Sequence, residues 1–221
     1  VAIMEQKKEE KRLWPLIAAS IGPYGAYLAN GAEYTGDYDL DEARLVEFHR
    51  PRWQILAGSE ADLLACETIP SLIEAQALVQ LLCETPGRYA WFSFSCRDGS
   101  SISDGTPITE CAALLEDNEQ VVAVGINCTP PRFIPELISN LSAVTQKPII
   151  VYPNSGEHYD AVAKCWHGLL IPAEFGTYSC EWHKAGAALI GGCCRTGPEH
   201  IRQIRDRFQL RLNDRSHLTA Y

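Results

Sequence analysis

The chain has 221 residues, of which 46% are apolar, and its formal net charge is −9. This length allows one sizeable hydrophobic core, so we expect a single domain over residues 1–221. An acidic chain argues against nucleic acid and an anionic membrane surface as partners. Its apolar runs are shorter than the roughly 18 residues that a membrane span needs, and no secretory signal pattern stands at its start. We therefore expect a cytoplasmic protein.

Alternating apolar runs and helical patterns predict six units of a strand followed by a helix. The predicted strands occupy residues 15–22, 61–70, 89–96, 121–128, 148–156 and 187–194. The predicted helices occupy residues 41–59, 71–85, 107–117, 133–145, 172–186 and 198–208, and residues 1–14 resemble the end of a charged helix. Ser71 and Glu74 have the spacing of a capping box at the start of one helix.

The strand pattern narrows the fold to two α/β classes. The strands are continuous apolar runs, which is typical of a parallel sheet. Repeated strand–helix units fit either a doubly wound sheet or a (β/α)8 barrel. Polar residues gather at the carboxyl ends of the strands, which is the barrel pattern for a functional site. Six strands are two short of a closed barrel, so we expect an incomplete TIM-type barrel.

Three cysteines end two of these predicted strands. The chain has nine cysteines, which we expect to be reduced and mostly buried. Cys128 ends "GINC", and Cys193 and Cys194 end "GGCC". Parallel strand ends share one rim, so the three thiols can meet there. Three thiolates and one open position form a catalytic zinc arrangement.

Adjacent side chains of a regular strand point to opposite faces, so both members of the cysteine pair can face one ion only if the backbone departs from β geometry. We expect Gly191 and Gly192 to supply that freedom. One alternative is that each cysteine packs as a small apolar residue. Another is a thiol-redox pair of Cys193 and Cys194, although adjacent cysteines fit disulfide geometry poorly.

Several motifs together resemble the homocysteine S-methyltransferase family, and most closely its S-methylmethionine-dependent members. The resemblance runs from about residue 18 to about residue 207, and it rests on "GPYGAYLANGAEYTGDY", "ADLLACETIP", "GINC", "VYPNSGEHYD" and "LIGGCCRTGPEHI". It implies a (β/α)8 barrel with Zn²⁺ held by Cys128, Cys193 and Cys194. It also implies methyl transfer from a sulfonium donor, S-methylmethionine or S-adenosylmethionine, to homocysteine, giving methionine.

The resemblance also implies that Glu67 binds the α-ammonium group of the amino-acid substrate; the alternative is a carboxylate that favours a helix N-terminus. Asn127 and Asn154 are candidates for binding the substrate carboxylate, for orienting the cysteines, or for bracing a loop. Aromatic faces attract sulfonium cations, and the candidates for this contact are Tyr24, Tyr27, Trp91 and Phe94. The acidic residues Glu33 and Asp37 are candidates for attracting the same donor. We assign neither His49 nor His158 as a zinc ligand.

The chain departs from the family at its start. The family begins with a strand ending in an Asp-Gly-Ala type motif, followed by a strand ending in a Thr-x-Ser/Thr-Tyr type motif, and neither is found here. The resemblance therefore implies that the first two strand–helix units are lacking. Two functions remain open: a zinc-dependent methyltransferase, or an inactive truncated barrel that binds zinc or forms a homo-oligomer through its open sheet edges.

Overall fold

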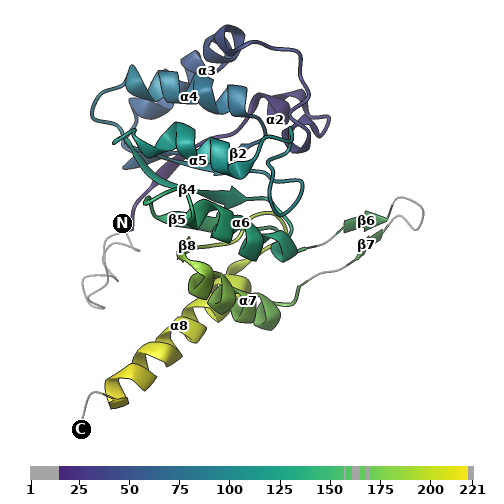
Figure 1. The fold of residues 1–221 in the computed structure, drawn as a ribbon, viewed down its shortest axis with the longest axis vertical. Coiled ribbons are helices and arrows are strands. Elements are labelled where there is room, and N and C mark those ends of the chain that lie inside the picture. Colours follow the sequence, from purple (N-terminus) through teal and green to yellow (C-terminus); the bar gives the residue numbers. More distant parts are fainter. Residues whose placement is uncertain (1–14, 157, 161–164, 168–169, 219–221) are drawn as a thin grey trace.

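Six parallel strands form one sheet in the computed structural model, which describes residues 15–156, 158–160, 165–167 and 170–218 (Figure 1). They are β1 (Ala18–Ile21), β2 (Leu63–Ile69), β3 (Ala90–Phe94), β4 (Val121–Asn127), β5 (Ile149–Tyr152) and β8 (Ala187–Ile190). All six predicted strands are confirmed, and each is shorter than predicted. The charged segment 1–14 lies outside the described residues.

The order of the strands decides between the two predicted classes. Neighbours follow the chain order β1-β2-β3-β4-β5-β8, and every pair is parallel. A doubly wound sheet reverses its strand order at a switch point, whereas a barrel does not. The fold is therefore an incomplete TIM-type barrel. In the described part of the chain, β1 and β8 each pair on one side only.

The six predicted helices are also confirmed. They are α3 (Glu42–Ala57), α4 (Leu72–Cys83), α5 (Ile108–Glu116), α6 (Ile134–Ser142), α7 (Pro172–Ala185) and α8 (Pro198–Leu218). Each contacts the next along the chain, and α8 extends beyond its predicted end at residue 208 (Figure 1). Within the described residues, none of the helices combines the length and hydropathy of a membrane span.

Alternation along the strands separates an apolar face from a polar one. Phe92 and Phe94 of β3 are fully buried in the core that the strands share with the helices. Trp91 and Ser93 lie on the opposite face, where both hydrogen-bond to the hydroxyl of Tyr152. Phe94 is therefore wrong as a candidate contact for a sulfonium donor, because the core encloses its ring.

Several short elements were not predicted. The loop after β1 contains α2 (Tyr24–Leu28) and the 3₁₀ helix η1 (Ala32–Tyr34), and η2 (Pro131–Phe133) precedes α6. A Cβ atom at Gly25 would collide with the backbone of Ala32 and Glu33 in η1, so glycine permits the close approach of α2 and η1. An antiparallel hairpin of β6 (His158–Asp160) and β7 (Cys165–His167) extends away from the sheet (Figure 1). The side chain of His158 lies outside the described residues.

The predicted capping box at α4 is wrong. Ser71 is the N-cap residue, but its side chain makes no capping hydrogen bond, and Asp104 accepts from the backbone N–H of Leu72 instead. Glu74 is fully buried and accepts from three donors: the backbone N–H of Tyr24 at 2.6 Å, the hydroxyl of Tyr38, and His49 Nε2 at 2.8 Å. A buried carboxylate needs such donors, because desolvation is costly without them. Glu74 thereby ties α4 to α3 and to the segment 22–41.

We predict that Glu74→Ala lowers the free energy of unfolding by about 3–5 kcal/mol, because it leaves buried donors without an acceptor. Chemical denaturation followed by circular dichroism measures this change. Glu84→Ala is the matched control at the other end of α4, since its carboxylate is 40% exposed in an ion pair with Arg50. Equal stability of the two variants would contradict the role assigned to Glu74.

Candidate metal centre

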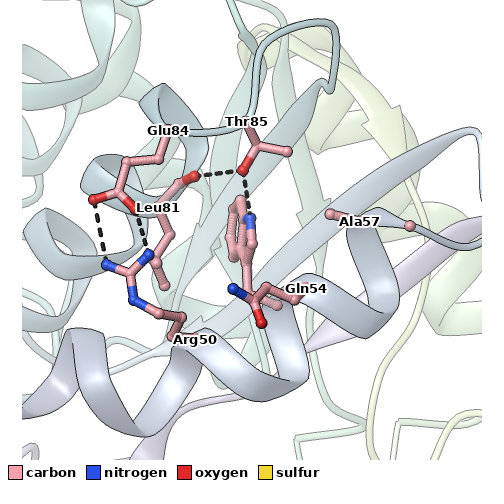
Figure 2. Close-up of a pocket in the computed structure, with 8 residues that line it drawn as sticks. Arg50, Gln54, Ala57, Leu81, Glu84 and Thr85 are labelled. Atoms are coloured by element: carbon pink, nitrogen blue, oxygen red, sulfur yellow. Dashed lines mark hydrogen bonds and ion pairs between the residues drawn. The ribbon is translucent and has the colours of Figure 1, made fainter.

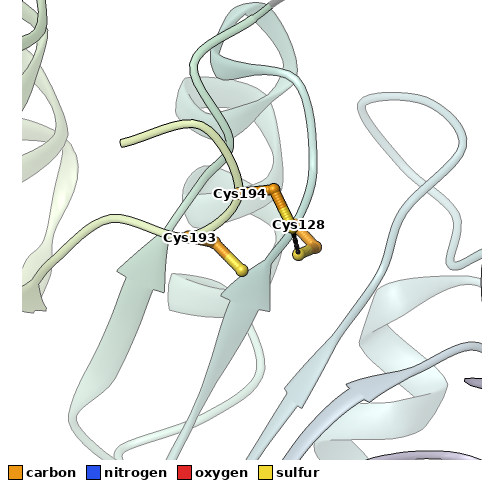
Figure 3. A group of neighbouring side chains, drawn as sticks. All are labelled: Cys128, Cys193 and Cys194. Atoms are coloured by element: carbon orange, nitrogen blue, oxygen red, sulfur yellow. Dashed lines mark hydrogen bonds between the residues drawn. The ribbon is translucent and has the colours of Figure 1, made fainter. Parts of the chain in front are cut away.

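The ends of β4 and β8 bring three sulfur atoms together (Figure 3). The Sγ atoms of Cys128, Cys193 and Cys194 all lie within 4.8 Å of one another, and those of Cys128 and Cys194 are 3.3 Å apart. The end of β5 lies between the two strands and bonds to both. The backbone N–H of Cys128 donates to Tyr152 O at 3.2 Å, and that of Cys193 donates to Pro153 O at 2.9 Å. Main-chain pairing therefore sets the spacing of the thiols.

The backbone leaves β geometry at the glycine pair, as expected, because β8 ends at Ile190 and residues 191–193 lie outside any strand. Cys128 has φ 49° and Arg195 has φ 64°, whereas neither Gly191 nor Gly192 has a positive φ. The departure from the strand at the glycine pair therefore needs no left-handed glycine, and the left-handed residues beside the thiols are Cys128 and Arg195. A Cβ atom at Gly192 would collide with the side chain of Thr196. Glycine is needed there for the close approach of the turn that follows.

Asn127 links the cysteines to the end of β2. Its Oδ1 accepts from the backbone N–H of Thr68 at 2.7 Å, and its Nδ2 donates to Thr68 Oγ1 at 2.7 Å and lies 3.8 Å from Cys193 Sγ. Asn154 Nδ2 is 3.4 Å from the carbonyl oxygen of Cys128, and its Oδ1 accepts from the backbone N–H of Gly156. Both asparagines thus contact the backbone or sulfur of the cysteine group.

Cys193 differs electrostatically from the thiols in the core. A hydrogen bond from Cys128 lowers the pKa of Cys193 to about 6, and the same bond, with burial, raises the pKa of Cys128. Burial raises the pKa of Cys66, Cys96 and Cys111 in the core. Because the thiolate binds metals and acts as the nucleophile, Cys193 is more reactive than the thiols in the core.

Sequence reasoning missed Tyr34, which ends η1. Its hydroxyl hydrogen-bonds to Cys128, and burial together with the charges of Cys128 and Cys194 raises the pKa of Tyr34. Ser95 Oγ fixes η1 by donating to Glu33 O at 2.9 Å. One carboxylate oxygen of Glu33 is buried without a hydrogen-bond partner among the described residues, while Asp37 is exposed. The only sequence signal for Tyr34 was its place between these two acidic residues.

The structure gives Glu67 two hydroxyl partners. Ser20 Oγ donates to its Oε1 at 2.5 Å, and the hydroxyl of Tyr152 donates to its Oε2 at 3.0 Å. Trp91 Nε1 donates in turn to Tyr152 at 3.0 Å, and Ser93 Oγ also hydrogen-bonds to it. Side chains of β1, β2, β3 and β5 therefore form one polar network on the polar face of the sheet. The alternative predicted for Glu67 was a carboxylate at a helix N-terminus. At the start of α4 this position is taken by Asp104, which accepts from the backbone N–H of Leu72.

The candidate aromatic residues separate into two groups. Trp91 lines a cavity of ≈310 Å³ together with Tyr152 and the glycine pair that precedes the cysteines, namely Gly191 and Gly192. Tyr24 packs on Phe48, with ring centres 4.8 Å apart, and Tyr27 beside it is 71% exposed. Of the two groups, that of Trp91 lies next to the loop that carries two of the thiols.

A second hollow of ≈300 Å³ lies between α3 and α4 (Figure 2). An ion pair of Arg50 and Glu84 bridges the two helices, and both side chains are partly exposed. The indole N–H of Trp53 donates to Thr85 Oγ1 at 2.9 Å, and Thr85 donates to the carbonyl oxygen of Leu81. These polar groups bind one another and fasten α3 to α4, so we assign no ligand to this hollow.

An in-order parallel barrel sheet with three thiols at its strand ends defines an α/β-barrel protein with a metal-competent cysteine site. The family model for homocysteine S-methyltransferase matches residues 1–208. The chain belongs to the homocysteine S-methyltransferase family, which confirms the resemblance seen in the sequence.

Individual relatives agree with this assignment. The chain is 57% identical over 199 residues to homocysteine S-methyltransferase YbgG of Bacillus subtilis, covering 89% of this chain and 63% of that protein. Crystal structures of the Escherichia coli homocysteine methyltransferase MmuM align with TM-scores of 0.82 (oxidized form, 44% identity) and 0.81 (metallated form, 42% identity). Each alignment covers 93% of this chain and 66% of MmuM. The chain thus spans less than two thirds of these relatives' lengths.

We predict that iodoacetamide modifies Cys193 and Cys194 in the folded, metal-free chain at least about tenfold faster than Cys66 or Cys111, because the latter are buried and protonated. Peptide mass spectrometry near neutral pH measures the rates. Cys83, which is exposed and distant from the strand ends in sequence, is the positive control for access. Labelling of the core cysteines at the rate of Cys193 would contradict the prediction.

Proposed function

We propose that the chain transfers a methyl group from S-methylmethionine, or from S-adenosylmethionine, to the thiol of homocysteine with the help of zinc. The observation that carries the proposal is the group of three thiols within 4.8 Å at the carboxyl ends of β4 and β8, in a member of this family. We place this chemistry in the cytoplasm, where thiols stay reduced.

The cysteine group fits the metal. A zinc–sulfur distance of about 2.3 Å puts tetrahedral sulfur ligands about 3.8 Å apart. The observed separations, from 3.3 Å for one pair to at most 4.8 Å, bracket this value. Soft thiolate ligands also favour zinc over magnesium or calcium. Cys128, Cys193 and Cys194 would hold the ion, which supplies Lewis acidity that stabilises a substrate thiolate.

The protein's own groups would bind and orient the two substrates. The carboxylate of Glu67 accepts from the α-ammonium group of homocysteine, while Asn127 and Asn154 keep the cysteine loops in place. The face of Trp91 contacts the sulfonium donor, and Tyr24 is a further aromatic candidate. The thiolate sulfur of homocysteine attacks the donor's methyl carbon, and the carbon–sulfur bond of the donor breaks with its electron pair on the leaving sulfur. Two neutral thioethers result, so the step needs no general acid.

Metal analysis tests the site. We expect about one zinc per chain after reconstitution, and its loss in Cys194→Ser, because two thiolates and a hydroxyl bind zinc far more weakly. Cys83→Ser is the control, since this exposed thiol is not part of the cysteine group. Zinc retained by Cys194→Ser at wild-type affinity would contradict the ligand set. Such retention would also reopen a redox role for the thiols.

The activity assay measures methionine formed from homocysteine by the zinc-loaded chain. We expect S-methylmethionine to be the better donor and S-adenosylmethionine the poorer one, in line with the family resemblance. Cys128→Ser is expected to abolish the activity. A faster reaction with S-adenosylmethionine would overturn the donor assignment but not the reaction class.

A second candidate is an inactive barrel that retains zinc binding or associates with itself. Two observations favour it: the chain spans 63% of its relative from Bacillus subtilis, and β1 and β8 each pair on one side in the described residues. Unpaired strand edges invite association with another chain. Zinc binding without methionine formation would support this candidate, and analytical ultracentrifugation would then show whether the chain is a monomer or a homo-oligomer.

A further inference from the structure

The hydroxyl of Tyr152 is the centre of the polar network around Glu67, and the network fixes the direction of its hydrogen bonds. An indole N–H can only donate, so Trp91 donates to the tyrosine oxygen. The single proton of Tyr152 is then free to go to the Glu67 carboxylate, 3.0 Å away. Ser93 Oγ supplies the remaining bond by donating to the same oxygen. The phenol is thus held as a donor to Glu67.

Two further features keep Tyr152 protonated and the Glu67 carboxylate in one orientation. Burial, together with the charge of Glu67, raises the pKa of Tyr152, so its proton is retained at physiological pH. Glu67 Oε1 receives its own donor, Ser20 Oγ, at 2.5 Å. Each carboxylate oxygen therefore accepts one hydroxyl proton, and the plane of the carboxylate is fixed from both sides.

The charge of Glu67 has no cationic partner within the part of the chain that the structure describes. Both of its donors are neutral hydroxyls. A carboxylate has about four acceptor positions, so about two remain for another donor. Tyr152 and Trp91 also line the ≈310 Å³ cavity that reaches Gly192, the residue before the cysteine pair. The cavity lining therefore includes both the hydroxyl donor to Glu67 and the glycine that precedes the cysteine pair.

We propose that Tyr152 is a positioning residue, which orients Glu67 to receive the α-ammonium group of the amino acid whose thiol reacts at the cysteine site. This inference rests on the proposed function and adds to it a residue that determines substrate specificity. Trp91 and Ser93 take part by holding the phenol as a donor. Tyr152 thereby favours homocysteine over an analogue that lacks the amino group, because its hydroxyl contacts the Glu67 carboxylate, which receives that amino group.

The test compares two ligands in the zinc-loaded full chain by isothermal titration calorimetry. The ligands are homocysteine and its des-amino analogue, which keeps the thiol and carboxylate but lacks the amino group. Tyr152→Phe keeps the ring and removes only the hydroxyl. We expect it to weaken the binding of homocysteine about tenfold or more and to leave the binding of the analogue unchanged. In turnover, the same variant raises KM for homocysteine and changes kcat little.

Tyr89→Phe is the matched control, because Tyr89 is 50% exposed just before β3 and should leave both affinities unchanged. Equal weakening for both ligands in Tyr152→Phe would overturn the inference, since that is the result of general damage to the site. Unchanged homocysteine affinity would overturn it as well. If the wild-type chain binds zinc but no homocysteine, the proposed function itself fails, which separates that outcome from a failure of Tyr152 alone.

Discussion

The main-chain pairing of β5 with its two neighbours is the constraint on which the site depends. The carboxyl end of β5 accepts hydrogen bonds from the backbone N–H groups of Cys128 on one side and Cys193 on the other. Thiols 65 positions apart in the chain are brought together because this short strand lies between them. The same strand end carries Tyr152, so one element sets both the metal-competent group and the orientation of Glu67.

Local sequence patterns predict much of this architecture. Apolar runs with helical segments between them specified six parallel strands, because only crossover helices connect such strands in order. Parallel strands end at one rim, so cysteines at the ends of the runs 121–128 and 187–194 were expected to converge. The repeated strand–helix units alone fit both the doubly wound and the barrel class, and the polar strand ends and the family resemblance favoured the barrel. The unreversed strand order, which depends on contacts across the whole sheet, decided between them.

What could not be predicted depends on partners far away in the chain. Ser71 and Glu74 match a capping box locally, yet Glu74 binds Tyr38 and His49, which lie 36 and 25 positions away. Burial made these partners stronger competitors than the adjacent backbone. Tyr152 looked like an ordinary strand residue for the same reason, since its proposed role comes from hydrogen bonds of its hydroxyl to side chains on β2 and β3. The hairpin of β6 and β7 falls in a segment without a periodic apolar pattern.

The left-handed backbone near the carboxyl ends of β2 and β4 has a consequence for how an ion would bind. Thr68 and Cys128 have φ 61° and 49°, conformations that cost of order 1–3 kcal/mol each for residues other than glycine. Asn127 binds the first through its side chain and precedes the second, so protein contacts hold both in place. The cysteine group is therefore arranged by folding, before any metal binds. Such a preformed site would bind a cation without refolding, whereas small zinc domains fold only when the metal binds.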